Sequence, residues 1–240
     1  TDDESAPTVT LSTSASSIAE NSGSSVTLTA TLSVATYQDV TVSISTSGTG
    51  TEGTDYATIS DITISAGSTT GTSSFTPTDD SVYEGNETGI AAISAVSGGG
   101  ATENGTQTQT ITITDNESAP TVTLSTSASN TAENSGGSLT LTATLSTATT
   151  ANVTVSIGTS GTASEGTDYG TISDITISAG STTGTTSFTP SNDSSVEGNE
   201  TATVSITGVS GGSATENGSQ AVTITITDDD TTPTVTLTSS

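Results

Sequence analysis

Residues 26–32 read Val-Thr-Leu-Thr-Ala-Thr-Leu, with an apolar side chain at every second position. Residues 111–114, Ile-Thr-Ile-Thr, alternate in the same way. Because successive side chains of a β-strand point to opposite faces, this period predicts strands with one apolar and one polar face. Threonine is β-branched, so it favours extended backbone while it presents a hydroxyl to solvent. The pattern predicts an all-β protein.

The sequence repeats at a fixed interval. Residues 7–11, Pro-Thr-Val-Thr-Leu, recur at 120–124 and at 233–237, and both offsets are 113 (120 − 7 and 233 − 120). Such a copy predicts tandem duplication, and this period suits one domain per repeat rather than one solenoid turn. We expect the tail of a preceding repeat or a linker at 1–6, domains at 7–117 and 118–230, and the first strand of a third repeat at 231–240.

Each repeat contains about seven segments with strand character, separated by turns rich in glycine, asparagine and serine. This arrangement is typical of an Ig-like β-sandwich. The links between repeats are short, acidic and end in proline, which favours a stiff junction and hence an elongated rod of tandem sandwiches. In the first repeat the expected strands are residues 8–13, 25–32, 40–45, 61–65, 71–76, 88–96 and 107–114.

The expected core is thin. Hydrophobic residues make up 28% of the chain and aromatic residues 2%, a composition for which disorder is the alternative, although the strand periodicity argues against it. We interpret Asp55-Tyr56 and Asp168-Tyr169 as structural pairs, in which the aspartate completes a turn and the tyrosine packs inside. The expected core residues of the first repeat are Val9, Leu11, Val26, Leu28, Leu32, Val42, Ile44, Ile62, Ile64, Phe75, Ile93, Ile111 and Ile113.

The chain has a formal net charge of −26 and contains no lysine, arginine or histidine. The negative charge and the lack of basic side chains argue against binding of nucleic acid or of an anionic membrane surface. No apolar run is long enough for membrane insertion. Without cysteine there is neither a disulfide framework nor a thiolate metal site. Since the chain has no methionine, we expect a processed form or an excerpt of a longer product.

Carboxylates are concentrated in residues 79–87, Asp-Asp-Ser-Val-Tyr-Glu-Gly-Asn-Glu, and in residues 192–200, Asn-Asp-Ser-Ser-Val-Glu-Gly-Asn-Glu. Two unit charges ~4 Å apart repel by roughly 4 kcal/mol at an effective dielectric constant of ~20. No side chain of this protein is cationic, so the compensating charge must come from outside. Oxygen ligands without histidine or cysteine point to calcium. The alternative is a solvated acidic surface that keeps the protein soluble.

Four motifs in this order resemble the Calx-beta domain: Glu20-Asn-Ser-Gly, Gly53-Thr-Asp-Tyr, the acidic stretch 79–87, and Ile113-Thr-Asp. The resemblance covers both repeats nearly end to end. It implies an Ig-like β-sandwich with a cluster of calcium ions at one end. Carried over by motif, the implied calcium ligands are Glu20, Asp79, Asp80, Glu84, Glu87, Asp115, Asn116 and Glu117 in the first repeat, and Glu133, Asp193, Glu197, Glu200, Asp228, Asp229 and Asp230 in the second.

Two positions depart from the family pattern. The aspartate that precedes the Gly-Thr-Ala segment in the family is Ser47 in the first repeat and Ser160 in the second. Asp79 of the first repeat is replaced by Asn192 in the second. With fewer carboxylates, we expect fewer or more weakly bound calcium ions than in the fullest family sites.

Calx-beta domains are known from sodium–calcium exchangers, integrin β4 and many large bacterial surface proteins. Near-exact repetition and short links favour a stalk or fibre segment of a secreted or cell-surface bacterial adhesin, stiffened by calcium. Its partners would be neighbouring repeats or identical subunits, while other domains would bind a surface or a glycan. The alternatives are a calcium-sensing binding module and a filament subunit that donates residues 234–237 as a strand.

An enzyme is not expected. Paired carboxylates can hydrolyse glycosides, but the chain offers no histidine, cysteine, lysine or arginine for other chemistry. The acidic cluster also occurs once in every repeat, which suits a structural role better than a single active site.

Overall fold

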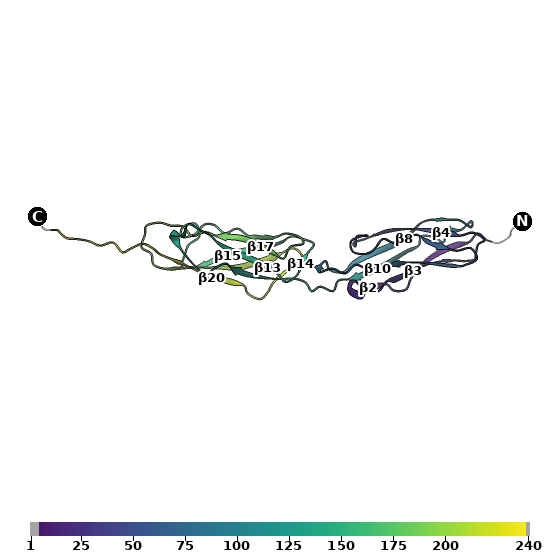
Figure 1. Cartoon of the computed structure of the whole chain (residues 1–240), viewed down its shortest axis with the longest axis horizontal. Helices are drawn as coiled ribbons and strands as arrows, with labels where there is room; N and C mark the ends of the chain where they lie inside the picture. Colours follow the sequence, from purple (N-terminus) through teal and green to yellow (C-terminus); the bar gives the residue numbers. More distant parts are fainter. Residues whose placement is uncertain (1–4, 239–240) are drawn as a thin grey trace. The chain divides into compact units, whose positions relative to one another are not determined.

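The computed structural model describes residues 5–238 and consists almost entirely of β-strands. The chain divides into two compact units, Thr1–Glu117 and Ser118–Ser240, which we call domain 1 and domain 2. Each unit is a β-sandwich of a four-stranded and a five-stranded sheet (Figure 1). Among residues 5–238, no helix has the length and apolar character that a membrane span requires.

In domain 1 the four-stranded sheet has the order β6-β3-β1-β9 and the five-stranded sheet the order β2-β10-β8-β4-β5. β1 runs antiparallel to β3 and parallel to the short β9. The elements are β1 (Thr8–Thr13), β2 (Ser17–Ala19), the 3-10 helix η1 (Glu20–Ser22), β3 (Val26–Leu32), β4 (Val40–Gly48), β5 (Ile62–Ile64), β6 (Thr70–Phe75), β7 (Val82–Tyr83), β8 (Glu87–Ser97), β9 (Thr102–Glu103) and β10 (Thr108–Thr114).

Domain 2 repeats this topology, with sheet orders β17-β13-β11-β19 and β12-β20-β18-β15-β16. Its elements are β11 (Thr121–Thr126), β12 (Asn130–Ala132), the 3-10 helix η2 (Glu133–Ser135), β13 (Leu139–Leu145), β14 (Ala148–Thr149), β15 (Val153–Gly161), β16 (Ile175–Ile177), β17 (Thr183–Phe188), β18 (Glu200–Ser210), β19 (Thr215–Glu216) and β20 (Ala221–Thr227). The described part of the expected third-repeat strand, up to residue 238, contains no strand, and Val235 and Leu237 are almost fully exposed.

The seven strands expected in the first repeat are all present, within three residues of the expected bounds. The structure adds β2, β7 and β9, each only two or three residues long. Segments this short have no measurable period, so alternation in the sequence does not reveal them.

The core matches the expectation closely. All the expected core side chains are buried except that of Ile44, which is half-buried. The register between β4 and β8 shifts between Ser43 and Ile44, and Asp61 Oδ1 accepts the Ile44 N–H at this irregularity. A register shift of this kind turns a side chain partly away from the core. The largest buried side chains are the stacked rings of Tyr56 and Phe75, whose centroids are 4.6 Å apart.

Candidate metal centre

The strand topology brings several carboxylates together at one end of each sandwich. β2 and β10 run parallel, with Ala19 paired to Thr114, so Glu20 and Asp115 both follow the ends of neighbouring strands. β8 runs antiparallel to β10 and begins with Glu87, which pairs with Ile113. Three segments far apart in the sequence therefore place acidic residues at the same end of domain 1. We call this the acidic end.

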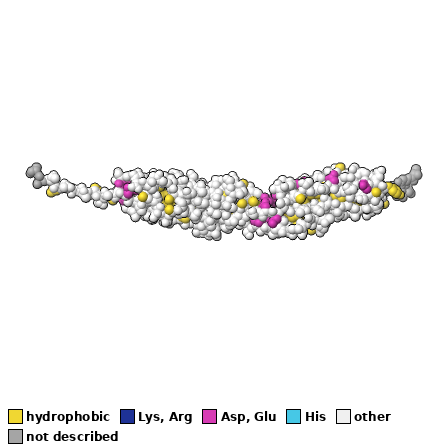
Figure 2. Space-filling view, viewed as in Figure 1, with side chains coloured by type: hydrophobic (Ala, Val, Ile, Leu, Met, Phe, Trp, Pro, Cys, Tyr) yellow, Lys and Arg dark blue, Asp and Glu magenta, His cyan; other side chains and the backbone are white. Residues whose placement is uncertain are grey.

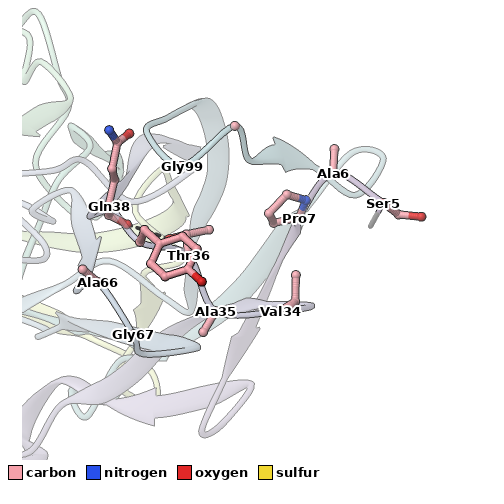
Figure 3. Close-up of a pocket in the computed structure, with 12 residues that line it drawn as sticks. Ser5, Ala6, Pro7, Val34, Ala35, Thr36, Gln38, Ala66, Gly67 and Gly99 are labelled. Carbon is pink, nitrogen blue, oxygen red and sulfur yellow. Dashed lines mark hydrogen bonds between the residues drawn. The ribbon is translucent and has the colours of Figure 1, made fainter. Parts of the chain in front are cut away.

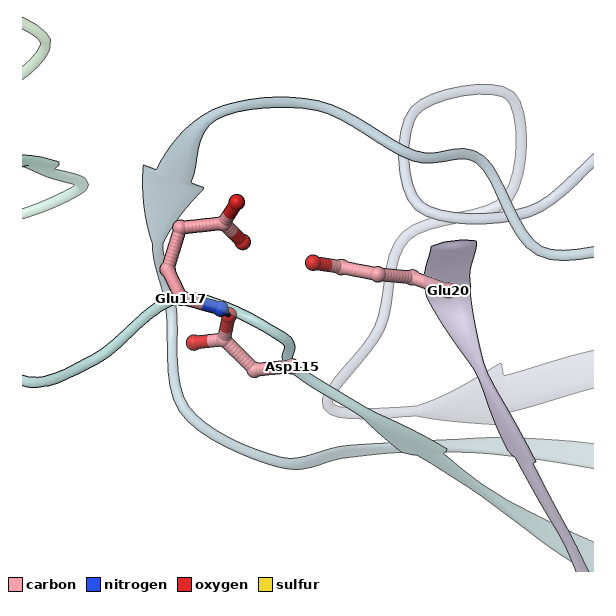
Figure 4. A group of neighbouring side chains, drawn as sticks. All are labelled: Glu20, Asp115 and Glu117. Atoms are coloured by element: carbon pink, nitrogen blue, oxygen red, sulfur yellow. Dashed lines mark hydrogen bonds between the residues drawn. The ribbon is translucent and has the colours of Figure 1, made fainter. Parts of the chain in front are cut away.

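The first cluster, which we call the Glu117 group, consists of Glu20, Asp115 and Glu117. Each offers a carboxylate oxygen within 4.8 Å of those of the other two. Figure 4 shows the three carboxylates pointing toward one another. Glu20 is only 6% exposed, and its Oε1 accepts the Asn116 N–H at 3.3 Å. No positive side chain balances this group, because the chain contains none.

The second cluster, the Glu84 group, consists of Asp55, Glu84 and Glu87, again with carboxylate oxygens within 4.8 Å of one another. Asp115 of the Glu117 group holds the loop that carries Glu84 and Gly85 in place. Its Oδ2 accepts the N–H groups of Glu84 at 2.9 Å and of Gly85 at 2.5 Å. The two groups are therefore connected through one carboxylate and the backbone.

The electrostatics of these groups favour a cation. Burial and the charges of Asp55 and Glu87 raise the pKa of Glu84 to about 7. Burial and the adjacent Glu20 raise the pKa of Glu117 to about 7. Burial acts in the same direction on Asp115, but three backbone N–H groups outweigh it and lower the pKa of Asp115. Asp115 is thus held charged by the backbone, while Glu84 and Glu117 bear unfavourable charge.

Domain 2 contains the same two groups. The Asp230 group is Glu133, Asp228 and Asp230, and the Glu197 group is Asp168, Glu197 and Glu200. Asp228 Oδ2 accepts the N–H groups of Glu197 and Gly198, as Asp115 does in domain 1. Figure 2 shows acidic side chains in magenta gathered in patches on a surface that is otherwise mostly uncharged.

Several carboxylate oxygens in these groups are buried without a hydrogen-bond partner. They are Glu117 Oε2, Glu133 Oε1 and Asp230 Oδ2. Burying a polar atom without a partner costs free energy, and burying a charged one costs more. A divalent cation would satisfy these oxygens and offset the repulsion. The donor set consists of hard oxygen atoms, the ligands that hard divalent cations such as calcium and magnesium prefer.

The Calx-beta domain family model matches residues 2–117 and again residues 115–230. The chain belongs to the Calx-beta domain family. It contains two such domains in tandem, and the second match begins at the acidic run that ends the first. The comparison with curated proteins returned no match.

The solved structures to which the chain is similar include CALX domains and bacterial adhesins. CBD12 from CALX1.2 is 16% identical, with 91% of this chain and 99% of that chain covered and a TM-score of 0.41. Invasin, described as a bacterial integrin-binding protein, is 18% identical, with 92% of this chain and 40% of that chain covered and a TM-score of 0.43. The adhesin InvE of Yersinia pseudotuberculosis is 14% identical, with 91% and 58% covered and a TM-score of 0.37.

Most of the residues implied by the Calx-beta resemblance belong to the four groups. These are Glu20, Glu84, Glu87, Asp115, Glu117, Glu133, Glu197, Glu200, Asp228 and Asp230. The others lie outside the groups. Those in domain 1 are Asp79, Asp80 and Asn116, and those in domain 2 are Asp193 and Asp229.

The residues outside the groups have other contacts or none. Asp80 Oδ1 accepts the Val82 N–H at 2.7 Å, and Asp193 Oδ1 accepts the Ser195 N–H at 2.6 Å, so both close the turn before the acidic loop. Asn116 Nδ2 donates to Glu117 Oε1 at 2.8 Å. Asp79 is exposed, and Asn134 Nδ2 donates to the carboxylate of Asp229.

Asp55 and Asp168 are the group members that the motif comparison left out. The structural interpretation of Asp55 is confirmed, since its Oδ2 accepts the Thr51 N–H at 2.6 Å and Tyr56 beside it is buried. The same carboxylate also faces Glu84 and Glu87. A bridge between Tyr56 and Pro77 brings Asp55 beside the start of the acidic stretch. The recurrence of Asp-Tyr in both repeats was the available signal.

Proposed function

We propose that this chain is a calcium-binding segment of a repeat array in a secreted or cell-surface bacterial adhesin or extracellular fibre. Calcium at the acidic groups would stiffen the array. The observation that supports this most directly is the pair of three-carboxylate groups at the acidic end of each domain. In the Glu117 and Asp230 groups, buried carboxylate oxygens have no hydrogen-bond partner. In a chain without basic residues, only an external cation can neutralise them.

The groups offer ligands of the kind that calcium prefers. Calcium takes about 6–8 oxygen atoms, and three carboxylates supply up to about six, with backbone carbonyls and water for the rest. In domain 1 the ligands would be Glu20, Asp115 and Glu117 for one ion, and Asp55, Glu84 and Glu87 for a second. Bound calcium would supply positive charge and hold the loops that carry these residues. We do not assign catalysis to these groups.

Stiffening follows from where the Glu117 group lies in the chain. Asp115 and Glu117 immediately follow β10, and the link from 116 to 119 leads to Pro120 before β11. A cation bound to both carboxylates would restrict the backbone of the first link residues. Proline restricts the other end of the link. The link would then have few conformations left. An array of domains joined by such links would be stiff.

One form of the filament alternative, in which the added strand 234–237 takes the place of β1 in another copy, is less favourable. These residues repeat the start of β1, which lies between β3 and β9 in its sheet. The side chains of Val9 and Leu11 in β1 are buried in the core. Exchange would bury Val235 and Leu237 of one chain but expose Val9 and Leu11 of the other. The apolar area buried would not change, so the exchange has no hydrophobic driving force.

The test is a thermal melt of the 240-residue chain followed by circular dichroism, in calcium, in magnesium and in EDTA. We expect calcium to raise the midpoint steeply and magnesium to raise it little, because the ligands are repulsive without a bound ion. Small-angle scattering should then show a narrower distribution of interdomain distances in calcium than in EDTA. Coincident melts would reduce the acidic groups to a solvated surface.

A matched control is available inside the repeat. Asp39 Oδ1 accepts the Ala66 N–H, and in domain 2 Asn152 makes the same bond to Ala179. Asp39→Asn therefore removes one negative charge outside the acidic groups while it keeps the hydrogen bond. Its calcium response should equal that of the unmodified chain, whereas Glu20→Gln and Glu87→Gln should lose most of theirs.

A further inference from the structure

The turn between β9 and β10, and its counterpart between β19 and β20, carry a reactive pair of residues outside the acidic groups. Asparagine directly precedes glycine at this turn in both domains, as Asn104-Gly105 and as Asn217-Gly218, and nowhere else in the chain. The other asparagines precede a residue with a side chain. Because glycine has no side chain, its backbone nitrogen is open to close approach by the preceding amide group.

The side-chain amides at the two turns have no partner. Asn104 and Gly105 are exposed, and among residues 5–238 neither the Asn104 side chain nor the Gly105 N–H has a hydrogen-bond partner. A Cβ on Gly105 would meet no atom within 4 Å beyond its chain neighbours, and φ of this residue is +65°. Asn217 and Gly218 are exposed and unpartnered in the same way. The side-chain amide is therefore free to rotate toward the next backbone nitrogen.

Most of the other asparagine side chains are held by hydrogen bonds, which restrict this rotation. They are Asn86, Asn116, Asn134, Asn152, Asn192 and Asn199. The remaining two have a shielded nitrogen after them. Asn21 lies in η1 and precedes Ser22, and Asn130 begins β12 and precedes the β-branched Thr131.

A glutamine acts on the peptide group that joins Asn104 to Gly105. Gln107 Nε2 donates to the Asn104 carbonyl at 2.6 Å, while Gln107 Oε1 accepts the Leu11 N–H at 3.1 Å. The Leu11 N–H determines which end of the glutamine amide faces Asn104, because only the NH2 end can donate. A hydrogen bond to the carbonyl draws electron density from the delocalised peptide bond and so makes the Gly105 N–H more acidic.

Domain 2 repeats this arrangement. Gln220 Nε2 donates to the Asn217 carbonyl at 2.6 Å, and Gln220 Oε1 accepts the Leu124 N–H at 3.4 Å. Both turns thus combine an unbonded amide, an unshielded backbone nitrogen and a donor on the carbonyl between them. These are the conditions under which the backbone nitrogen can attack the side-chain amide.

We propose that Asn104 and Asn217 are sites of spontaneous deamidation, with Gln107 and Gln220 as positioning residues. In domain 1 the Gly105 nitrogen loses its proton to hydroxide and bonds to Asn104 Cγ, while Nδ2 takes a proton from water and leaves as ammonia. Water then opens the resulting five-membered succinimide. Opening at Cγ gives aspartate, and opening at the main-chain carbonyl gives isoaspartate. The reaction consumes only water and is independent of calcium and of the proposed function.

Both products add a carboxylate where no basic side chain can balance it. Glu103 directly precedes Asn104, and its Oε1 already accepts the Gln107 N–H at 2.7 Å. Isoaspartate also adds a methylene to the main chain, beside the bond from the Asn104 N–H to the Val9 carbonyl. That bond continues the parallel pairing of β9 with β1 at the edge of the four-stranded sheet. Deamidation should therefore loosen β9.

The start of β9 is connected to a pocket of domain 1. Pro7 and Gly99 are among the residues that line this pocket (Figure 3). The Thr102 N–H donates to the Pro7 carbonyl at 2.9 Å. Loosening of β9 should therefore also displace Pro7 and this wall of the pocket.

The test is incubation of the folded 240-residue chain at neutral and at mildly alkaline pH, followed by cleavage after glutamate and mass spectrometry. Each event replaces NH2 by OH, and fragment spectra assign the mass gain to one residue. Isoaspartate is detected separately with a protein-isoaspartate methyltransferase and S-adenosylmethionine. We expect Asn104 and Asn217 to convert several-fold faster than Asn21, which precedes serine. Equal rates at all asparagines, or no conversion at the two turns, would overturn the proposal.

The variant Gln107→Glu tests the positioning role. Its carboxylate still accepts the Leu11 N–H but cannot donate to the Asn104 carbonyl. Asn104 should convert several-fold more slowly, while Asn217 of the same chain keeps its rate as an internal reference. Loosening of the turn by the substitution would speed conversion instead, so a purely structural role predicts the opposite sign.

Gln109→Glu adds the same charge on the same strand and is the matched control for Gln107→Glu. It should leave both rates unchanged, and equal slowing in the two variants would assign the effect to charge and overturn the positioning role. The variant Asn104→Gln/Asn217→Gln should keep its melting temperature during incubation, because glutamine would have to close a larger ring. The unmodified chain should lose melting temperature as isoaspartate accumulates. An equal loss in both chains would overturn the loosening of β9.

Discussion

The acidic ends of domains 1 and 2 share one backbone frame but differ in burial and charge. Glu84 is half-buried in domain 1, whereas its counterpart Glu197 is exposed. Burial is the main cause that raises the pKa of Glu84, but the charge of Asp193 is the main cause for Glu197. Near-identical sequences thus produce two sites that destabilise the metal-free protein for different reasons. The repeat keeps the backbone arrangement of the site the same, while burial and neighbouring charges differ between the two sites.

The shared frame depends on the aspartate that follows the last strand, and its removal should have the largest effect. Asp115 accepts the N–H groups of Glu84, Gly85 and Glu117. Because hydrogen bonds to a charged group each contribute about 1.5–3 kcal/mol, Asp115→Ala should lower the free energy of unfolding by about 3 kcal/mol or more. Chemical denaturation in calcium measures this. Asp228→Ala should cost domain 2 a similar amount, and a negligible cost in either domain would contradict a common frame.

The two cores differ at several positions, and one of them, Gly89 on a strand of domain 1, allows a smaller test. A Cβ on Gly89 would lie 2.3 Å from Phe75 Cε2, and domain 2 carries Ala202 at the same position. Phe75 is fully buried and stacked on Tyr56, so Gly89→Ala should destabilise domain 1 by about 1–3 kcal/mol through overpacking. Urea denaturation measures the change. The reverse change, Ala202→Gly, should cost about 0.5–1 kcal/mol through backbone entropy, and a stabilising Gly89→Ala would show that the ring moves freely.

The metal-free protein should become less stable as the pH rises from about 4.5 to about 7. The pKa of Glu84 is raised from 4.5 to about 7 in the folded state, so the folded state binds the proton more tightly than the unfolded chain does. This contribution is complete below pH 4.5 and is lost as the pH rises through about 7. Glu117 acts in the same direction. Melts in EDTA at several pH values measure the effect, and Glu84→Gln should flatten the dependence.

Calcium should suppress this pH dependence, because it replaces the proton as the compensating charge. The same melts in excess calcium serve as the comparison. An identical slope in calcium and in EDTA would mean that the cation does not bind near Glu84.

The smallest effect is expected at the position where the two acidic stretches differ in charge. Asn192 replaces the aspartate of domain 1 and is exposed. Asn192→Asp should raise the calcium affinity of domain 2 only a few-fold, since exposed charges interact weakly through water. Calorimetry at low ionic strength measures this. A large gain would show that Asn192 lies among the ligands once calcium is bound.

The expected strands and most of the core were predictable because both depend on the local period of apolar residues. Ile44 differs because the register shift between β4 and β8 is set by pairing with a distant strand. The short β2 was not predictable either, although its parallel pairing with β10 places Glu20 beside Asp115. Non-local pairing therefore decides features that no local pattern encodes.

By itself, the sequence determined the all-β character, the period of 113 residues, the family and the lack of any basic side chain to balance the carboxylates, since alternation, repetition and charged residues can be counted along the chain. Only the tertiary structure decided which carboxylates meet. Asp55 joins Glu84 and Glu87 because the Tyr56–Pro77 bridge folds its loop back, while Asp79, closer to both in sequence, points to solvent. Proximity of side chains depends on strand pairing and core packing, which separation along the chain does not measure.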